Sequence, residues 1–514
     1  MTKIFLYGPS GSGKSTVGKV LAENLGLSLV DLDALIEEQA GMPIPQIMSE
    51  QGMSAFRDKE SAALEQMAEN EAGVVALGGG ALLREQNRAL AESAGVVVFL
   101  QANVDTLVAR LSADYSRPLL AGDLRERLTG LLEGRKEHYA SFPLRFDVDA
   151  LTPQQIAWQI QIALGRFHIG GMGAAYDALV APGGLDHLGA LLRERSLDGP
   201  IAIVTESNVG PLYAARAAKS LREAGYETTV VTFPAGEANK TLESIQHIWS
   251  GLLQGGLDRK SSVVALGGGV TGDMAGFAAA TFMRGVRWVG VPTSLLSMVD
   301  ASLGGKTGID LPQGKNLIGA FHPPSLVLAD PGLLASLPEA ELRSGLAEVV
   351  KHGIISDPGL FALCAAGLDS VKNNLAGIVG RAMAVKAAVI EADPYERGIR
   401  ASLNLGHTVG HAVELVSAFK LRHGEAIAIG TVVEARLAER LKLAESGLTE
   451  EIAAALDGLG LPTRIPSEMS REAIIQAMKV DKKKAAGVVK FALPVKVGEV
   501  KVGVAVEDLG LVFK

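Results

Sequence analysis

A phosphate-binding pattern lies close to the N-terminus. Residues 8–16 read GPSGSGKST, which matches G-x-x-x-x-G-K-[ST] between the apolar run KIFLY and a helical run at 17–25. Such glycines let backbone N–H groups approach phosphate oxygens, while the lysine adds charge and the serine hydroxyl reaches Mg²⁺. The pattern predicts a nucleoside triphosphate site and leaves the phosphoryl acceptor open. The residues expected at ATP and magnesium are Gly11, Ser12, Gly13, Lys14, Ser15 and Thr16, with Asp31 as a second magnesium candidate.

Candidate metal ligands are concentrated in the C-terminal half. Four of the nine histidines, His352, His407, His411 and His423, fall between residues 351 and 425, and Glu348 precedes them. His407 and His411 are four residues apart, so on a helix they share one face, and spacing alone nominates both as zinc ligands. Two imidazoles and a carboxylate would leave a coordination position open for substrate hydroxyls. The group therefore predicts a catalytic metal site.

A second glycine turn, GGGVTGD at 267–273, follows a buried apolar run. It is not the G-x-G-x-x-G fingerprint, yet a helix N-terminus there can still receive the pyrophosphate of a dinucleotide. Taken alone, the turn is open to two interpretations, a nucleotide site or a packing turn.

Composition excludes several classes of protein. Lys and Arg number 49 against 57 Asp and Glu, a net charge of −8, so no global basic field favours nucleic acid or an anionic membrane. Cys364 is the only cysteine, which excludes an intrachain disulfide and cysteine-rich metal sites and favours a reducing cytoplasm. The N-terminus lacks the apolar stretch of a signal peptide, and we expect no membrane span.

The pattern of elements predicts three domains and a linker. Strand-like and helical runs alternate over 1–166, which is typical of a parallel α/β sheet. Residues 167–175 include three glycines and no clear periodicity, so we expect a flexible linker there. A second α/β domain is expected over 176–336, and a mainly helical domain with a terminal hairpin over 337–514.

The first half resembles shikimate kinase, through the ordered strings LYGPSGSGKST, DLD, FRDKE, LGGG, RPLL and RKEHY. The resemblance implies a P-loop kinase fold in which Asp33, Arg57, Gly79 and Arg135 hold shikimate, and Arg117 belongs to a lid that closes on ATP. Asp33 and Lys14 would then be catalytic. Without the resemblance, arginines such as Arg57 and Arg135 are more often solvated helix residues, and Asp33 could equally be a helix cap.

The second half is similar to 3-dehydroquinate synthase, through PAGEANKTLES, ALGGGVTGDMAGF, VPTSLLSMVDASLGGKTGID, GKNLIGAFHPP, GLAEVVKHGII, LNLGHTVGHAVE and RHGEAIAIG. The resemblance implies an NAD-binding α/β domain, a helical metal domain and a homodimer formed through this half. Zinc, or alternatively cobalt, would be held by Glu348, His407 and His423, whereas His411 would belong to the substrate site. The implied NAD residues are Glu237, Lys240, Gly269, Val270, Thr271, Gly272, Asp273, Thr293, Ser294, Lys306 and Lys315.

The implied substrate is 3-deoxy-arabino-heptulosonate 7-phosphate, which needs cations at its carboxylate and at its phosphate. Its implied contacts are Arg284, Asp300, Lys306, Asn316, Lys351, Lys386, Arg400, Asn404 and His411. Of these, Lys351, Lys386, Arg400, Asn404 and His411 are the expected catalytic residues. The remaining alternatives are a metal-dependent polyol dehydrogenase, a related sugar-phosphate cyclase, another small-metabolite kinase in the first half, and a module without activity.

Overall fold

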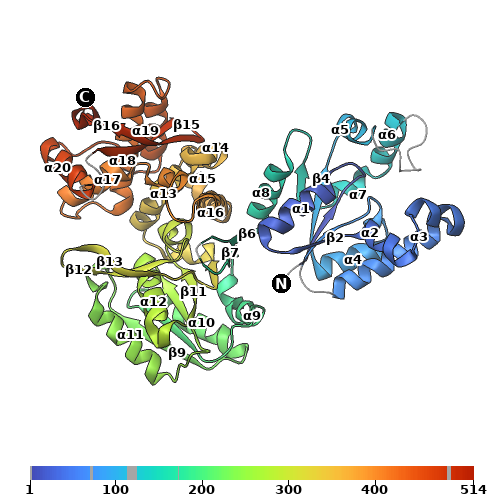
Figure 1. The fold of residues 1–514 in the computed structure, drawn as a ribbon, viewed down its shortest axis with the longest axis horizontal. Helices are drawn as coiled ribbons and strands as arrows, with labels where there is room; N and C mark the ends of the chain where they lie inside the picture. The colour runs from blue at the N-terminus through green and yellow to red at the C-terminus, as the bar shows by residue number, and fades with distance from the viewer. Residues whose placement is uncertain (1–2, 70–72, 113–123, 172, 483–487, 514) are drawn as a thin grey trace. The chain divides into compact units, whose positions relative to one another are not determined.

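The computed structural model describes residues 3–69, 73–112, 124–171, 173–482 and 488–513 (Figure 1). The chain divides into two compact units, Met1–Leu164 and Gly165–Lys514. Among the helices in the described ranges, none has both the length and the apolar character needed to cross a membrane.

The first unit is built on a parallel sheet in the order β2-β3-β1-β4-β5. Its strands are β1 (Lys3–Tyr7), β2 (Ser28–Asp31), β3 (Gly73–Ala76), β4 (Gly95–Gln101) and β5 (Arg145–Asp147). Ile4 and Leu6 pack with α1, α5 and α8 on one face, whereas Phe5 and Tyr7 pack with α2, α3 and α4 on the other. The predicted parallel α/β fold is confirmed. The helices are α1 (Lys14–Leu25), α2 (Leu32–Ala40), α3 (Ile44–Glu69), α4 (Glu85–Ala94), α5 (Val104–Leu111), α6 (Leu124–Gly134), α7 (Lys136–Ala140) and α8 (Pro153–Leu164).

The second unit begins with a sheet in the order β6-β7-β14-β11-β10-β8-β9, in which only the β6–β7 pair is antiparallel. The helix α12 follows β10 directly and packs on this sheet, and the hairpin of β12 and β13 lies beside α12. The elements are β6 (Arg166–Ile169), β7 (Tyr176–Val180), α9 (Leu188–Arg193), β8 (Ile201–Glu206), α10 (Gly210–Glu223), β9 (Thr228–Phe233), α11 (Leu242–Gln254), β10 (Ser262–Gly267), α12 (Gly269–Thr281), β11 (Arg287–Pro292), β12 (Lys306–Leu311), β13 (Gly314–Phe321) and β14 (Leu326–Ala329).

The linker predicted at 167–175 is partly a strand. β6 pairs with β7 in a register that joins Phe167 to Ala178 and Ile169 to Tyr176, and both β6 residues are buried. The prediction was wrong because four alternating residues are too few to distinguish a strand from a loop, and this strand depends on its pairing partner. The sheet of the second unit therefore starts at Arg166 rather than at residue 176.

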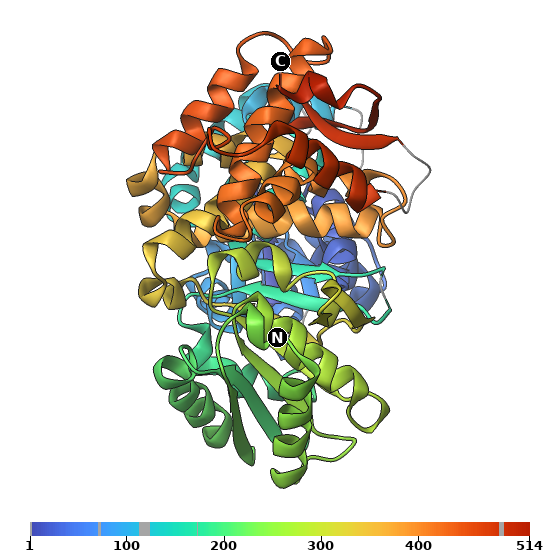
Figure 2. The ribbon, with the colours of Figure 1, turned by 90° about the vertical axis from the view of Figure 1, so that its left-hand side faces the viewer.

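Helices dominate the rest of the second unit, which ends in an antiparallel hairpin of β15 and β16, as the sequence predicts. Figure 2 shows these elements, gold to red, gathered to one side of the green sheet-bearing part. They are α13 (Glu339–Ser356), α14 (Pro358–Ala365), α15 (Leu368–Asn373), α16 (Leu375–Ala392), α17 (His407–Val416), α18 (His423–Arg440), α19 (Leu448–Gly458), α20 (Arg471–Lys482), β15 (Val489–Lys496) and β16 (Glu499–Val506).

Candidate active sites of the two units

The phosphate-binding turn lies between β1 and α1. Gly8, Gly11 and Gly13 have φ angles of 152°, 85° and 93°, which side chains rarely adopt, so the turn needs glycine at these positions. Lys14 Nζ donates to the carbonyls of Gly8 and Pro9 at 2.9 and 3.0 Å. The lysine ammonium is thereby held against the loop that would receive phosphates.

The two magnesium candidates are hydrogen-bonded to each other. Ser15 Oγ donates to Asp31 Oδ2 at 2.5 Å, while the neighbouring Thr16 is exposed on α1. Asp31 also caps α2, because its Oδ1 accepts the N–H groups of Asp33 and Ala34 at 3.1 and 3.4 Å. Asp31 therefore orients the start of the helix that carries Asp33.

The residues predicted to bind the phosphoryl acceptor surround the glycine turn after β3. Arg135 Nη1 donates to the Gly79 carbonyl at 2.7 Å. Cβ atoms added at the two flanking glycines would lie 2.8 Å from Asp33 Oδ1 and 2.5 Å from Arg57 Nη2. One carboxylate and two guanidinium groups thus meet at one turn, which suits a hydroxylated carboxylic acid.

Two side chains of this site were not identified from the sequence. Glu60 is 1% exposed and pairs with Arg57 at 2.5 Å; burial raises the pKa of Glu60, and Arg57 only partly opposes this. Their three-residue spacing on a helix was the available signal. Arg110 Nη1 donates at 3.3 Å to the carbonyl of the buried Ser12, and its segment carries no motif. Arg117 lies outside the described residues.

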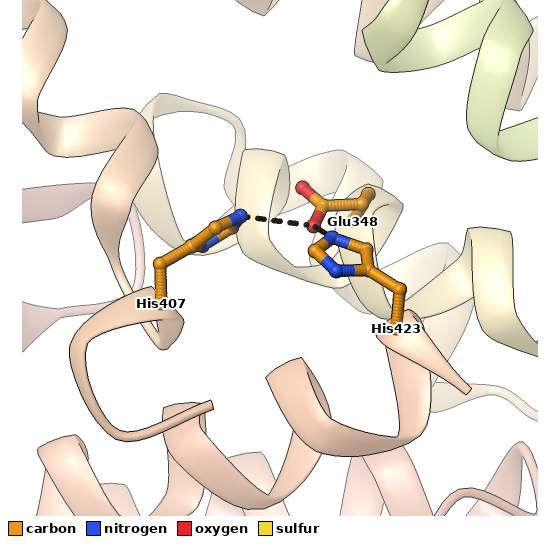
Figure 3. A group of neighbouring side chains, drawn as sticks. All are labelled: Glu348, His407 and His423. Atoms are coloured by element: carbon orange, nitrogen blue, oxygen red, sulfur yellow. Dashed lines mark ion pairs between the residues drawn. The ribbon is translucent and has the colours of Figure 1, made fainter. Parts of the chain in front are cut away.

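In the second unit, three predicted metal ligands meet (Figure 3). Glu348 lies on α13, and His407 and His423 are the first residues of α17 and α18. The Nε2 atoms of the two histidines lie 3.5 and 3.4 Å from Glu348 Oε1, and candidate ligand atoms of all three residues lie within 4.8 Å of one another. They converge because α18 packs against both α13 and α17.

The remaining ring nitrogens of this set have partners that orient them. His407 Nδ1 donates to the Leu405 carbonyl at 3.0 Å, so its Nε2 is the nitrogen left to bind a cation. His423 Nδ1 lies 3.4 Å from Glu414 Oε2. Hydrogen bonds of this kind fix the tautomer and direction of metal-binding imidazoles.

Charge around Glu348 also suits a divalent cation. The side chain is fully buried and forms an ion pair with Lys351; burial opposes its ionisation, but Lys351 and then His407 outweigh burial and hold the pKa of Glu348 well below its usual range. Burial, followed by Lys351, lowers the pKa of His407 to about 3, so this imidazole is neutral. An ionised carboxylate beside a neutral imidazole fits the zinc donor set.

His411 groups differently from His407. Its ring centroid lies 5.1 Å from that of His407, but its ligand atoms cluster with Glu414 and His423. Across the described ranges, no cluster of candidate ligands contains both His407 and His411. The nomination of both residues from their four-residue spacing is therefore not supported by the geometry.

A cavity of about 520 Å³ lies beside this set, between β12, β13 and the helical part. Every residue that the sequence implies for the heptulosonate lines it except Arg284 and His411. Arg284 is exposed, with a φ of 73°. The lining includes Asp273, Asp300, Lys306, Thr307, Asn316, Phe321, Lys351, Lys386, Glu396, Arg400, Leu403, Asn404 and His407.

Lysines in the cavity are paired with carboxylates. Lys386 donates to Asp300 Oδ1 at 2.5 Å, and Lys306 Nζ lies 3.1 Å from Glu396 Oε2. Burial opposes ionisation of Asp300, but Lys386 outweighs burial and lowers its pKa; burial lowers the pKa of Lys386 itself. Glu396, which also accepts from Asn404 at 3.3 Å, was not identified from the sequence, because it lies in a loop without a recognisable pattern.

The predicted cofactor residues lie around the turn from β10 to α12. Lys240 Nζ donates to Asp273 Oδ2 at 2.6 Å and to Asn316 Oδ1 at 2.5 Å, which links α12 to β13. Lys315 Nζ lies 3.8 Å from Glu237. A small recess there is lined by Gly269, Gly272, Asp273 and Lys306. The N–H of Thr293 donates to the Gly267 carbonyl, and Ser294 Oγ accepts the N–H of Ser297. Val270 is half-buried and Thr271 is buried.

Comparison with known proteins assigns both units. Residues 10–164 match the shikimate kinase family model, and residues 230–344 and 345–484 match the models of the N-terminal and C-terminal parts of 3-dehydroquinate synthase. A 3-dehydroquinate synthase from Symbiobacterium thermophilum is 47% identical over 336 residues, which cover 64% of this chain and 93% of that protein. The chain belongs to the 3-dehydroquinate synthase family. A shikimate kinase domain precedes the synthase.

Solved structures of other cyclases share the fold of the synthase unit. A 2-deoxy-scyllo-inosose synthase complexed with carbaglucose-6-phosphate, NAD⁺ and Co²⁺ is 26% identical, with a TM-score of 0.61 and coverage of 66% of this chain and 96% of that one. A 2-epi-5-epi-valiolone synthase from Streptomyces hygroscopicus, with NAD⁺ and Zn²⁺ bound, is 28% identical, with a TM-score of 0.60 and coverage of 66% and 95%.

Proposed function

We propose that this protein is a bifunctional enzyme of the shikimate pathway. Its kinase unit transfers phosphate from ATP to shikimate, and its synthase unit, a carbon–oxygen lyase, cyclises 3-deoxy-D-arabino-heptulosonate 7-phosphate to 3-dehydroquinate and phosphate. The observation that carries the synthase assignment is the cavity of paired lysines beside the Glu348, His407 and His423 set. Support for the kinase is the meeting of Asp33 and two arginines beside the phosphate loop.

In the kinase unit, Lys14 would exchange its loop carbonyls for the β and γ phosphates of ATP, and Ser15 and Asp31 would hold Mg²⁺. Arg57 and Arg135 bind the carboxylate of shikimate. Asp33 accepts the proton of the attacking hydroxyl, for which its position at the same glycine turn is suitable.

In the synthase unit, Glu348, His407 and His423 would hold Zn²⁺ or Co²⁺, and the turn into α12, with Asp273, would hold NAD⁺. The metal would supply Lewis acidity towards a substrate hydroxyl, and the nicotinamide would supply reversible hydride transfer with no net redox change. The chain's own part is to bind the anionic groups of the substrate. Lys351, Lys386, Arg400, Asn404 and His411 are the residues that we assign to this role and to proton transfer.

Binding of the substrate exchanges ion pairs rather than creating new ones. Each lysine named in the cavity already faces a carboxylate, and the Lys306–Glu396 pair is the most exposed of these, at 58% and 41% of the two side chains. A substrate phosphate or carboxylate therefore displaces Glu396 most easily, since this pair is the least desolvated.

Related cyclases with other sugar phosphates are the alternative, because they share the fold. The higher identity to the dehydroquinate synthase, 47% against 26–28%, favours the heptulosonate. We also infer a homodimer formed through the synthase unit, which the exposed apolar residues Leu317, Ile318 and Phe321 on β13 support. A cytoplasmic location fits the single, buried Cys364.

The test is direct. The full chain is incubated with the heptulosonate phosphate, NAD⁺ and Zn²⁺, and separately with shikimate and Mg·ATP, and the products are identified by mass spectrometry. We expect 3-dehydroquinate plus phosphate, and shikimate 3-phosphate. Steady accumulation of NADH, or turnover of only another acceptor or sugar phosphate, would contradict the assignment.

A further inference from the structure

The first hairpin of the synthase unit contacts the loop that carries Arg400. Burial raises the pKa of Glu391, on the last turn of α16, and the backbone of Gly170, just after β6, partly opposes this. Gly171, with a φ of 95°, is so close to the start of the next loop that a Cβ there would lie 2.4 Å from Pro394 Cγ. The segment predicted as a linker therefore packs against the base of the loop 393–404.

Tyr176, the first residue of β7, contacts the same region through its side chain. Its side chain is 4% exposed, and its hydroxyl oxygen accepts the N–H of Gly304 at 2.9 Å. A Cβ at Gly304 would lie 3.0 Å from Arg400 Nη2. The Gly304 backbone, which is hydrogen-bonded to Tyr176, therefore lies next to the Arg400 guanidinium. Burial raises the pKa of Tyr176 to about 12, with Gly304 and Arg400 opposing, so the hydroxyl is neutral at physiological pH.

Arg400 itself is anchored by its own loop. It is 5% exposed, its N–H donates to Asp393 Oδ2 at 3.1 Å, and its guanidinium donates to the Pro394 carbonyl. Two of the groups beside its guanidinium, Pro394 and Gly304, are also contacted by the hairpin.

We propose that Tyr176 is a positioning residue for the synthase reaction, which acts through Gly304 on Arg400, and that the β6–β7 hairpin seats the substrate-binding loop. This inference rests on the proposed function, in which Arg400 binds the heptulosonate phosphate. It assigns a role in one active site to the segment that joins the two enzymes.

The test compares Tyr176→Phe with Tyr226→Phe in the full chain. Tyr226 is a matched control because it is also 4% exposed and makes one hydrogen bond to the backbone, to the Leu197 carbonyl at 2.6 Å, and it does not line the cavity. Binding of the heptulosonate phosphate to metal-stripped protein is measured by calorimetry, with KM and kcat of the loaded enzyme. We expect Tyr176→Phe to weaken binding and raise KM by about fivefold, and Tyr226→Phe to change neither.

Coupling to Arg400 is tested with the double variant. In an Arg400→Lys background, Tyr176→Phe should weaken binding by less than about a further twofold, because the guanidinium that Tyr176 positions is no longer present. Equal effects of the two tyrosine variants, or full multiplication of the Tyr176 and Arg400 effects, would overturn the proposal. If wild-type protein neither binds nor cyclises the substrate, the proposed function fails instead.

A second pair of variants tests the hairpin without removing the tyrosine. Gly171→Ala and Gly173→Ala both place alanine at a positive φ, 95° and 103°, but only the first pushes on Pro394, since the nearest atom to a Cβ at Gly173 is 3.8 Å away. We expect the first to weaken substrate binding several times more than the second. Equal substrate binding by the two variants would show that the β6–β7 hairpin does not seat the substrate-binding loop.

Discussion

At the scale of single residues, both active sites depend on buried charges that are held in pairs. Glu60 is paired with Arg57, and Glu348 with Lys351, and both carboxylates are at most 1% exposed. Removing one partner of such a pair leaves the other charge buried and unpaired, which costs more than the pair itself contributes. Substitutions that break these buried pairs therefore destabilise the fold as well as the site. Function is better tested by removing a metal ligand or a mobile cation that is not part of such a pair.

The metal assignment predicts different results for two neighbouring histidines. His423→Ala removes an atom that lies 3.4 Å from Glu348, so we expect zinc to be lost and cyclisation to stop. His411→Ala should retain nearly full zinc and lose turnover only. Metal content by mass spectrometry and cyclisation rates decide this, and equal zinc loss in both variants would restore the pairing of His407 with His411.

For the kinase, Lys14→Ala should lower shikimate phosphorylation by about a hundredfold or more, because the phosphate loop loses its ammonium. Cyclisation by the same protein should be unchanged, which serves as the internal control for folding. Phosphorylation near the wild-type rate would exclude the phosphate-loop assignment.

At the scale of elements, the β6–β7 hairpin is closed by a charged cluster. Asp177 lies 2.9 Å from both His168 Nδ1 and Arg195 Nη2, and Arg166 and Glu391 face the same group. The hydrogen bond to Asp177 raises the pKa of His168, despite partial burial. For Asp177, burial opposes ionisation, but His168 and Arg195 lower its pKa.

This cluster predicts a pH-dependent stability. A histidine whose pKa is raised in the fold stabilises it fully below its unfolded pKa of about 6.5, and this stabilisation is lost as the pH rises through the higher folded value. The free energy of unfolding of the wild type should therefore exceed that of His168→Asn by about 1 kcal/mol at pH 6, and this difference should shrink towards pH 9. Thermal unfolding of both proteins across this range measures the difference. An advantage that grows with pH would show that His168 is bound in its neutral form.

At the scale of the whole molecule, the two enzymes are joined without a spacer. α8 ends at Leu164 and β6 begins at Arg166, and the residue between them, Gly165, has a φ of 60° and accepts the N–H of Val180 at 2.8 Å. Each candidate active site described above is built from residues of a single unit. Independent folding of the units is therefore expected, provided that the chain is divided at this glycine.

Fragments test this expectation. The fragments 1–164 and 165–514 should each keep nearly the full activity of their unit. A fragment 174–514 should lose cyclisation at least tenfold, because it lacks β6 and leaves the edge of β7 unpaired. Both activities are measured for each fragment alone and mixed. Full activity of 174–514 would show that the hairpin is dispensable, and loss of activity in folded 165–514 would refute independence.

Much of this protein could be predicted from its sequence because the deciding residues are close together in the chain. The phosphate loop, the buried strands and the terminal hairpin are local patterns of a few residues, so their geometry follows from glycine positions and periodicity. The resemblance then supplied the set of charged residues that lines the cavity. The role of the segment around His168 could not be predicted, since a short edge strand forms only where a partner strand is present.

The sequence by itself determined the two enzyme classes and the kinds of residue at each site, because motifs record chemistry directly. Spacing alone left open which residues share a point in space, and only the tertiary structure decided this, although the resemblance had already implied the set Glu348, His407 and His423. The grouping of His407 with His423 and Glu348 instead of with His411 depends on how α13, α17 and α18 pack, and spacing along one helix contains no information about its neighbours. The same holds for Glu396 and Tyr176, whose environments are created by segments distant in the chain.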